Sequence, residues 1–475
     1  VVAITCNVGT ALLGKDSFQE VDIAGIVMPV TKHSYIVKDV TKLADTIRKA
    51  FIIAKSGRPG PVLVDVPKDV TAAKCEYIRH TITAVEPKVD TIRPKDVDTA
   101  AQMIAAAKKP FIFVGGGAVI ADASEEVRAL AHKIQAPVCD SLMGKGAFSG
   151  EDELYTGPVG MHGTKTSNYA MCECDLLITL GARFSDRVTG DTKTFAPKAK
   201  ILQIDVDAAE INKNIAVDAS VIGDLREVLK LLLVKIPEKR HDEWVQHIQD
   251  MKEKYPLNYD HSQLTGPYVI QKLYELTGGD AIVSTDVGQH QMWAAQYYKY
   301  SKPRTLLTSG GLGTMGYGLP GGIGAKIGNP DRPVIVISGD GGVQMNIQEL
   351  ATAVLEELPV ILCIFNNEYL GMVRQWQKLF YGKRYSMTNL RAGALSRRTD
   401  GEEYPEYTPN FIKLAESYGA KGIRVMKKED IAAAFEEAKK NIKTPTIIEF
   451  IIDPEEMVYP MIKPGGTLED MIMDC

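Results

Sequence analysis

The sequence has almost no net charge for its length. Its 55 Lys and Arg residues are set against 60 Asp and Glu residues, which gives a formal net charge of −5 over 475 residues. Such a balance provides no global attraction to nucleic acid or to an anionic membrane, so we expect neither as a partner. Long apolar runs are also missing. Val334–Ser338 and Val360–Phe365 are among the longest, and both fall far short of the roughly 20 residues of a membrane-spanning helix.

Cysteine is scarce and forms no disulfide pattern. The seven cysteines are an odd number, which favours a reducing compartment. Cys172 and Cys174 have no further ligands beside them, so we interpret them as buried neutral residues and not as a metal site. The sequence has no initial Met and no targeting segment, and it opens directly on the strand-like stretch Val1–Thr5. We therefore expect that residues are missing ahead of Val1. A bacterial-type cytoplasmic location is predicted, and a transit peptide stays open.

Short β-branched runs alternate with helical patterns along the whole chain. Each run is followed by Gly, Asp or Asn and then by helical spacing, which predicts parallel sheets covered by helices, the α/β class. The predicted strands are Pro61–Val66, Phe111–Val114, Leu176–Leu180, Ile201–Val206, Ile282–Thr285, Val334–Ser338, Val360–Phe365 and Thr446–Ile451.

Two polar stretches divide the chain. Cys75–Lys95 is expected to be a linker and Ile236–Gly266 a helical connector. The boundaries give a first part at 1–80, a middle domain at 90–235 and a third domain at 258–450. The first part is short and is expected to be the C-terminal half of an α/β domain. The tail at 451–475 carries prolines and glycines and is expected to lie over the surface.

Polar side chains follow two of the predicted strands in the third domain. Ser338-Gly339-Asp340-Gly341-Gly342 follows the first strand, and Asn366-Asn367 follows the second. If the two strands are parallel neighbours, both tips emerge at the same sheet edge, where α/β proteins bind ligands. Carboxylate, amide and carbonyl oxygens suit Mg2+, and glycines let backbone amides approach phosphates. Each motif alone is also compatible with an ordinary loop turn, and only the pair at this spacing is specific.

The pair resembles the metal–diphosphate motif of thiamine-diphosphate-dependent enzymes. The resemblance implies metal ligands at Asp340, Asn367 and the main-chain oxygen of Tyr369. It also implies three domains with doubly wound parallel sheets, the first of them incomplete here. Contacts to the cofactor are implied for Val287, Gly288, Gln289, His290, Gly313, Met315, Gly339, Gly341 and Gly342. Met315 would hold the two cofactor rings in a V, although a methionine taken alone is more often a core residue.

Several stretches narrow the resemblance to acetohydroxyacid synthase, also called acetolactate synthase, the large catalytic subunit. They are Asp16–Glu20, Thr31–His33, Ser56–Asp69, Gly160–Gly163, Gly181–Gly190, Ile204–Asn214 and Gly371–Gln377. The implied reaction decarboxylates pyruvate on thiamine diphosphate and joins the two-carbon unit to pyruvate or 2-ketobutyrate, in branched-chain amino-acid biosynthesis. Two alternatives stay open: a sister enzyme of the pyruvate oxidase or oxalyl-CoA decarboxylase type, and a cofactor-binding fragment of low activity.

The family resemblance also assigns the acceptor site. A guanidinium can bind a 2-keto acid carboxylate bidentately, and Arg187 is that residue by resemblance. Trp376 would select the acceptor, with Met372 on the same helical face, although both also fit a helix core stripe. Phe18 and Gln19 would reach this pocket from a partner subunit. We therefore expect a homodimer or homotetramer, and a regulatory small subunit stays open as a further partner.

The middle domain resembles the FAD-binding domain of these synthases. The residues that match flavin-contacting positions are Arg58, His162, Gly163, Arg183, Asp205 and Asp224. Gly115 and Gly116 follow the predicted strand Phe111–Val114 and could admit a dinucleotide backbone, although a glycine cluster alone is weak evidence for that. Since the reaction moves no net electrons, FAD would be structural.

Three features depart from the family pattern. The glutamate that activates the cofactor ring is expected upstream of Val1, Ser185 stands where many relatives have Asp, and the charged segment 390–407 is expected to be a solvated loop.

Overall fold

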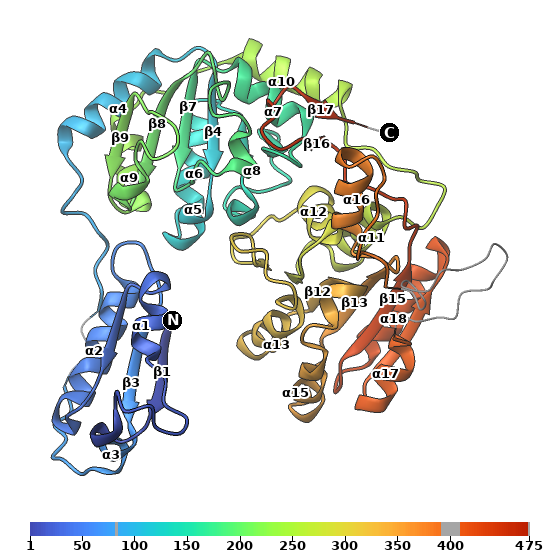
Figure 1. The fold of residues 1–475 in the computed structure, drawn as a ribbon. Coiled ribbons are helices and arrows are strands. Elements are labelled where there is room, and N and C mark those ends of the chain that lie inside the picture. Colours follow the sequence, from blue (N-terminus) through green and yellow to red (C-terminus); the bar gives the residue numbers. More distant parts are fainter. Residues whose placement is uncertain (81–83, 391–408, 474–475) are drawn as a thin grey trace.

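The computed structural model describes residues 1–80, 84–390 and 409–473, and Figure 1 shows three parallel sheets that follow one another along the chain. This confirms the predicted α/β class. The first sheet has the strand order β1-β3-β2, and α2 (Val40–Lys55) packs on it through Ala50 and Ala54. Its strands are β1 (Val2–Asn7), β2 (His33–Ile36) and β3 (Val62–Pro67).

The middle sheet has six parallel strands in the order β6-β5-β4-β7-β8-β9. Helices cover both faces, which is why its central strands are mostly apolar. The strands are β4 (Pro110–Val114), β5 (Val138–Asp140), β6 (Tyr155–Pro158), β7 (Leu176–Leu180), β8 (Lys200–Asp205) and β9 (Ala219–Ile222). One face is covered by α4 (Pro94–Ala106), α6 (Ser124–Lys133) and α9 (Leu225–Lys235), and the other by α7 (Lys165–Glu173) and α10 (Asp242–Lys254). The short helices α5 (Gly116–Ile120) and α8 (Asp186–Thr189) follow β4 and β7.

The third sheet also has six parallel strands, in the order β11-β10-β12-β13-β15-β14. They are β10 (Ile282–Thr285), β11 (Leu306–Thr308), β12 (Val334–Gly339), β13 (Ile361–Asn366), β14 (Lys421–Val425) and β15 (Thr446–Ile451). One core lies under α11 (Gly266–Thr277), α12 (Gln289–Tyr297) and α18 (Ile431–Lys440), and the other under α13 (Gly318–Gly328), α15 (Leu350–Leu355) and α17 (Phe411–Tyr418). The chain leaves β10 for β11 on one side and later adds β12 on the other, so the carboxyl ends of β10 and β12 form a switch point where α/β sheets bind ligands.

The C-terminal tail is buried in part, so the prediction of a surface tail is wrong for its apolar residues. Val458, Met461, Ile462 and Leu468 are at most 1% exposed. In Figure 1 the tail runs from the third sheet to the middle one, where β16 (Met461–Ile462) pairs with β17 (Met471–Ile472). The apolar residues of the tail pack between the third and the middle sheet. This long-range packing outweighs the local pattern of prolines and glycines, which predicts a surface loop.

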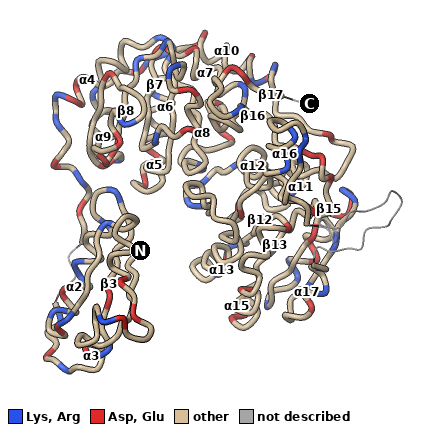
Figure 2. Tube along the Cα trace, in the orientation of Figure 1, with Lys and Arg blue, Asp and Glu red and all other residues tan. Residues whose placement is uncertain are grey.

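Charge is spread evenly over the fold. Figure 2 shows Lys and Arg interspersed with Asp and Glu along all three sheets and their helices. Within the described ranges, no helix combines the length and the apolar character needed to cross a membrane.

Candidate active site

The two polar loop tips of the third sheet meet. Asp340 begins α14 (Asp340–Val343) directly after β12, and Asn367 follows the neighbouring strand β13. The backbone N–H of Glu368 donates to Asp340 Oδ2 at 2.6 Å and to Asn366 Oδ1 at 3.1 Å. Glu368 adopts a left-handed φ of 62°, which turns this amide toward the aspartate. Residues 27 apart in the sequence, Asp340 and Asn367, are thereby brought to one place.

Asp340 is a buried carboxyl group, and no cationic side chain in the described part of the chain hydrogen-bonds to it. Burial raises the pKa of Asp340 to about 7, against the backbone N–H groups of Glu368 and Gly341, which lower it. Asn367 Oδ1 accepts from the Tyr369 N–H at 3.1 Å. Among the described residues no group of three or more His, Cys, Asp or Glu side chains could hold a metal. The site instead offers one carboxylate beside amide and carbonyl oxygens, a donor set that suits Mg2+ with water and phosphate completing the shell.

His290 supplies an unpaired buried nitrogen beside these loops. Its ring lies so close to Gly339 that a Cβ there would be 3.0 Å from His290 Cε1, and at Gly288 the same distance would be 2.7 Å. Burial lowers the pKa of His290 to about 4, so the ring is neutral near pH 7. Within residues 1–80, 84–390 and 409–473, His290 Nε2 has no hydrogen-bond partner. A buried polar atom at the end of parallel strands fits a phosphate oxygen, since leaving it unpaired costs free energy.

The glycines of this region are required by close packing. A Cβ on Gly341 would lie 2.6 Å from Leu370 Cδ2, and one on Gly342 would lie 2.4 Å from Asp286 Oδ1. Gly313 has a φ of 64° in the loop that carries Met315. These contacts fix the backbone where the sequence predicts a cofactor cradle.

Asp286 is a site residue that the sequence analysis missed. It follows β10 and is 1% exposed, and its carboxylate accepts from the N–H groups of Val287, Gly316 and Gly318 at 2.8–3.2 Å. The loop that carries Met315 is therefore anchored by one buried carboxylate. An aspartate at the end of a buried strand, directly before a Gly-containing turn, was the available signal.

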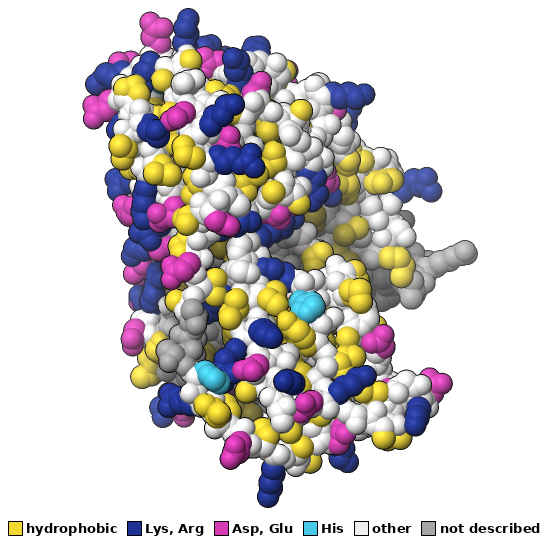
Figure 3. Space-filling model, turned by 90° about the vertical axis from the view of Figure 1, so that its left-hand side faces the viewer, with side chains coloured by type: hydrophobic (Ala, Val, Ile, Leu, Met, Phe, Trp, Pro, Cys, Tyr) yellow, Lys and Arg dark blue, Asp and Glu magenta, His cyan; other side chains and the backbone are white. Residues whose placement is uncertain are grey.

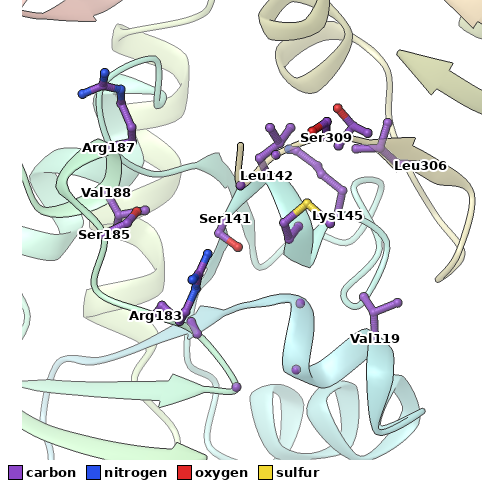
Figure 4. A pocket seen from close by; sticks show the side chains of 18 of the residues that line it. Val119, Ser141, Leu142, Lys145, Arg183, Ser185, Arg187, Val188, Leu306 and Ser309 are labelled. Atoms are coloured by element: carbon purple, nitrogen blue, oxygen red, sulfur yellow. The ribbon is translucent and has the colours of Figure 1, made fainter. Parts of the chain in front are cut away.

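A cavity of about 1790 Å³ lies between the three parts of the chain. Figure 4 shows Arg183, Ser141 and Lys145 of the middle part facing Leu306 and Ser309 of the third. The predicted residues that line it are Arg58, Gly116, His162, Arg183, Arg187, Asp205, Asp224, Val287, Gly288, Gly313, Met315, Met372 and Trp376.

Other predicted residues lie elsewhere. Gly115 packs against the backbone of Gly181 and Ala182, and Gly163 against that of Gly160. Phe18 is 88% exposed on the first part, and Gln19 is exposed beside it. Within this one chain, then, these two residues are not brought to the cavity. The prediction of a solvated loop at 390–407 falls almost entirely outside the described residues, because 391–407 are not among them.

The wall between the first and middle sheets is polar. Arg58 donates to Asp207 at 3.0 Å and to Glu210 at 2.8 Å, which joins the first part to the middle one. Asp205 accepts from the Asp207 N–H at 2.9 Å, and burial raises the pKa of Asp205. Asp224 is the N-cap of α9. Its side chain accepts from the Glu227 N–H at 3.2 Å, which stabilises the start of the helix.

On the opposite wall, Arg187 and Trp376 come together. The Arg187 guanidinium lies 5.7 Å from the centre of the Trp376 ring, and it also pairs with Asp186 at 2.8 Å. Arg187 belongs to α8 and Trp376 to α16 (Gly371–Phe380), so the pair spans the middle and third parts. Beside them burial lowers the pKa of His162 to about 4, and its Nδ1 lies 3.1 Å from the Pro460 carbonyl.

The fold and this site define a thiamine pyrophosphate enzyme. Family models for the central domain and for the C-terminal TPP-binding domain of such enzymes match residues 97–232 and 286–450. Among curated proteins, the chain is 44% identical to an acetolactate synthase large subunit of Corynebacterium glutamicum, covering 99% of this chain and 75% of that protein. It is 43% identical to a probable acetolactate synthase large subunit of Methanocaldococcus jannaschii (99% and 80%) and 42% identical to the large subunit of Cyanidium caldarium (99% and 80%). The chain belongs to the acetolactate synthase large-subunit family.

Proposed function

We propose that this protein is the catalytic subunit of an acetolactate synthase. It decarboxylates pyruvate and joins the two-carbon unit to a second pyruvate, or to 2-ketobutyrate, in branched-chain amino-acid biosynthesis. Thiamine diphosphate, when bound, supplies the electron sink that lets the 2-keto acid lose carbon dioxide. The observation that carries the proposal is the joining of the two strand-end loops over one buried carboxylate, Asp340, beside the unpaired Nε2 of His290.

The metal site is proposed to hold Mg2+ through Asp340, the Asn367 amide oxygen and the Tyr369 carbonyl oxygen. The donor set supports this assignment, because hard oxygen ligands leave positions for water and diphosphate oxygens. His290 Nε2 would contact the diphosphate, and Met315 would support the two cofactor rings. The Gln289 side chain already donates to Gln375 and to the Glu456 carbonyl, so a diphosphate contact of Gln289 would come from its main chain. The Asp286 carboxylate holds the Met315 loop in place by its backbone hydrogen bonds.

The acceptor 2-keto acid is proposed to bind at Arg187. Its guanidinium can grip a carboxylate with two parallel hydrogen bonds. The Trp376 ring lies against the same guanidinium and offers an apolar face to the acceptor's alkyl group, with Met372 one turn away. A methylene in such a pocket contributes roughly 1–3 kcal/mol, which would favour 2-ketobutyrate over pyruvate.

A structural FAD is proposed for the polar side of the cavity. The supporting residues are Arg58, Arg183 and Asp205, which line it together with Gly116. The arginines of this cavity suit a diphosphate, because a guanidinium binds phosphate oxygens through parallel hydrogen bonds.

A homodimer is proposed, with Phe18 and Gln19 completing the partner's pocket. Figure 3 shows apolar side chains over the lower lobe, where the first part lies. Several of its residues are more than half exposed: Ile4, Phe18, Ile26, Met28 and Val30. Such surfaces mark interaction sites. A homotetramer, a regulatory small subunit and a cytoplasmic location belong to the same proposal.

One assay separates this function from its sister activities. The purified protein is incubated with pyruvate, thiamine diphosphate, Mg2+ and FAD, and the products are measured. Acetolactate in the colorimetric assay is expected. Peroxide or acetyl phosphate would instead indicate a pyruvate oxidase, and activity on oxalyl-CoA alone would indicate the decarboxylase type.

A further inference from the structure

Three side-chain amides form a buried chain across the site. Asn367 Nδ2 donates to Gln289 Oε1 at 3.3 Å, and Gln289 Nε2 donates to Gln375 Oε1 at 3.0 Å. Gln375 lies on α16, 86 residues from Gln289, and is 2% exposed. It ends on the tail, where its Nε2 donates to the Val458 carbonyl at 3.0 Å and its Oε1 accepts from the Val458 N–H at 2.9 Å.

Backbone groups decide which way each amide points. The Val458 N–H can only donate, so it holds the oxygen of Gln375 on its side. Gln289 must then present its nitrogen to that oxygen, and the same nitrogen also donates to the Glu456 carbonyl at 2.8 Å. The remaining Gln289 oxygen faces the Asn367 nitrogen. The oxygen of Asn367 is therefore the atom left on the opposite side, where it accepts from the Tyr369 N–H at 3.1 Å.

We propose that Gln375 is a positioning residue that orients the Asn367 amide for the metal. This inference rests on the proposed metal site and adds to it a residue from another element. An amide flipped by 180° would present N–H groups, which cannot bind a cation. Partners that orient a ligand from behind contribute strongly to metal affinity, typically 10–100-fold. Through the same residue, the tail is coupled to the metal site.

Gly371 closes the chain of amides from the other side. A Cβ there would lie 2.1 Å from Gln289 Oε1 and 2.7 Å from Asn367 Nδ2. Any side chain at this position must therefore push the Gln289–Asn367 hydrogen bond apart. Gly371→Ala thus disturbs the chain of hydrogen-bonded amides Asn367–Gln289–Gln375, here called the relay, without deleting any of its hydrogen-bonding groups.

The test is a calorimetric titration of full-length protein with Mg2+ at saturating thiamine diphosphate. Gln375→Leu should weaken Mg2+ binding by about 10–100-fold. Gln375→Glu should retain most of the affinity, because a buried, protonated Glu both accepts from Gln289 and donates to the Val458 carbonyl. In steady-state kinetics, the half-saturating Mg2+ concentration of Gln375→Leu should rise, while kcat at saturating Mg2+ stays close to wild type.

Gln296→Leu is the matched control. Gln296 also binds the tail region through its side chain, donating to the Tyr459 carbonyl at 3.1 Å and to the His162 carbonyl at 3.0 Å, but it does not contact Gln289. Its Mg2+ affinity should stay at the wild-type value. An equal loss in Gln296→Leu and Gln375→Leu would mean that tail docking alone matters, and would overturn the relay.

Unchanged Mg2+ affinity in Gln375→Leu would also overturn the proposed role of Gln375. If that variant does not fold, Gly371→Ala decides, because wild-type affinity there contradicts the relay and a weakened one supports it. A wild-type protein that binds neither Mg2+ nor thiamine diphosphate would sink the proposed function itself. A binding wild type with unaffected variants would sink only the role of Gln375.

Discussion

The Arg187 guanidinium stands 5.7 Å from the centre of the Trp376 ring, across the seam between the middle and third parts of the chain. An aromatic face attracts a cation and limits the directions in which it can point. Arg187 is 59% exposed along its side chain, so it remains accessible to a small anion. A guanidinium and an aromatic ring are thus held together although the two residues lie 189 positions apart in the sequence.

Trp376→Leu should reduce the preference for 2-ketobutyrate over pyruvate as acceptor. The indole offers a wide apolar face, and a methylene bound there contributes roughly 1–3 kcal/mol, so a severalfold fall in the preference is expected. Competition between the two acceptors, with both products quantified, measures it. Phe380→Leu is the control. The ring centres of Phe380 and Trp376 lie 5.6 Å apart in an edge-on arrangement, and Phe380 is not among the residues that line the cavity. An unchanged ratio in Trp376→Leu would contradict the proposed role.

Asp340→Ala should abolish Mg2+-dependent binding of thiamine diphosphate. The substitution removes the one carboxylate of the proposed donor set, and a hard cation loses its strongest ligand. Calorimetry with the cofactor, with and without Mg2+, provides the measurement. Asp331→Ala removes an exposed aspartate of the same part of the chain and should bind normally. Retained affinity in Asp340→Ala would show that the metal lies elsewhere.

Asp286→Asn should loosen the Met315 loop. In the variant, the side-chain NH2 group would face the N–H group of Gly316 or Gly318. In the wild type these N–H groups donate hydrogen bonds to the Asp286 carboxylate. A hydrogen bond to a charged group contributes about 1.5–3 kcal/mol, so a lower thermal midpoint and weaker cofactor binding are expected. Asp280, just before the same strand, forms exposed ion pairs with Lys302 and Arg332, and Asp280→Asn should change little. Equal thermal midpoints of the two variants would refute the anchoring role.

Sedimentation of the protein with its cofactors should give at least twice the chain mass of 52.0 kDa. The exposed apolar residues of the first part, Ile26 and Met28 among them, would be covered in such an assembly. Ile26→Asp should shift the equilibrium toward the monomer, because a buried charge without a partner is costly. A wild-type monomer at micromolar concentration would exclude a pocket shared between subunits.

The strands were the most predictable part of the fold. Leu176–Leu180, Ile282–Thr285 and Thr446–Ile451 are found at the predicted bounds, because each is a short buried run rich in apolar and β-branched residues. The meeting of the Asp340 and Asn367 tips followed from the same logic of parallel neighbours.

What escaped prediction depends on packing between distant elements. The buried tail around Val458 has the prolines and glycines of a loop, and its partners lie on other parts of the chain. The hydrogen bond between Gln289 and Gln375 joins two helices that the sequence leaves unrelated. Asp286 was missed because its three backbone partners lie in loops whose course depends on the whole sheet.

Glu456 should make the protein less stable as pH rises. Its Oε2 accepts from the Gly266 N–H at 2.8 Å in a half-buried position, and burial raises the pKa of Glu456 from 4.5 to about 8. The folded protein therefore keeps a proton that the unfolded chain releases, and the stability present below pH 4.5 is lost as pH rises toward 8, by at most about 1.4 kcal/mol per pH unit.

Glu456→Gln should flatten the fall of the thermal midpoint between pH 5 and pH 8, because a neutral amide accepts the same hydrogen bond at every pH. The neighbouring Glu455 provides a control of opposite sign. Hydrogen bonding to Arg374 lowers the pKa of Glu455, so the stability it contributes is lost as pH falls, and Glu455→Gln should leave the fall at high pH in place. Midpoints of Glu456→Gln that still decline with pH as steeply as wild type would assign the effect to another group.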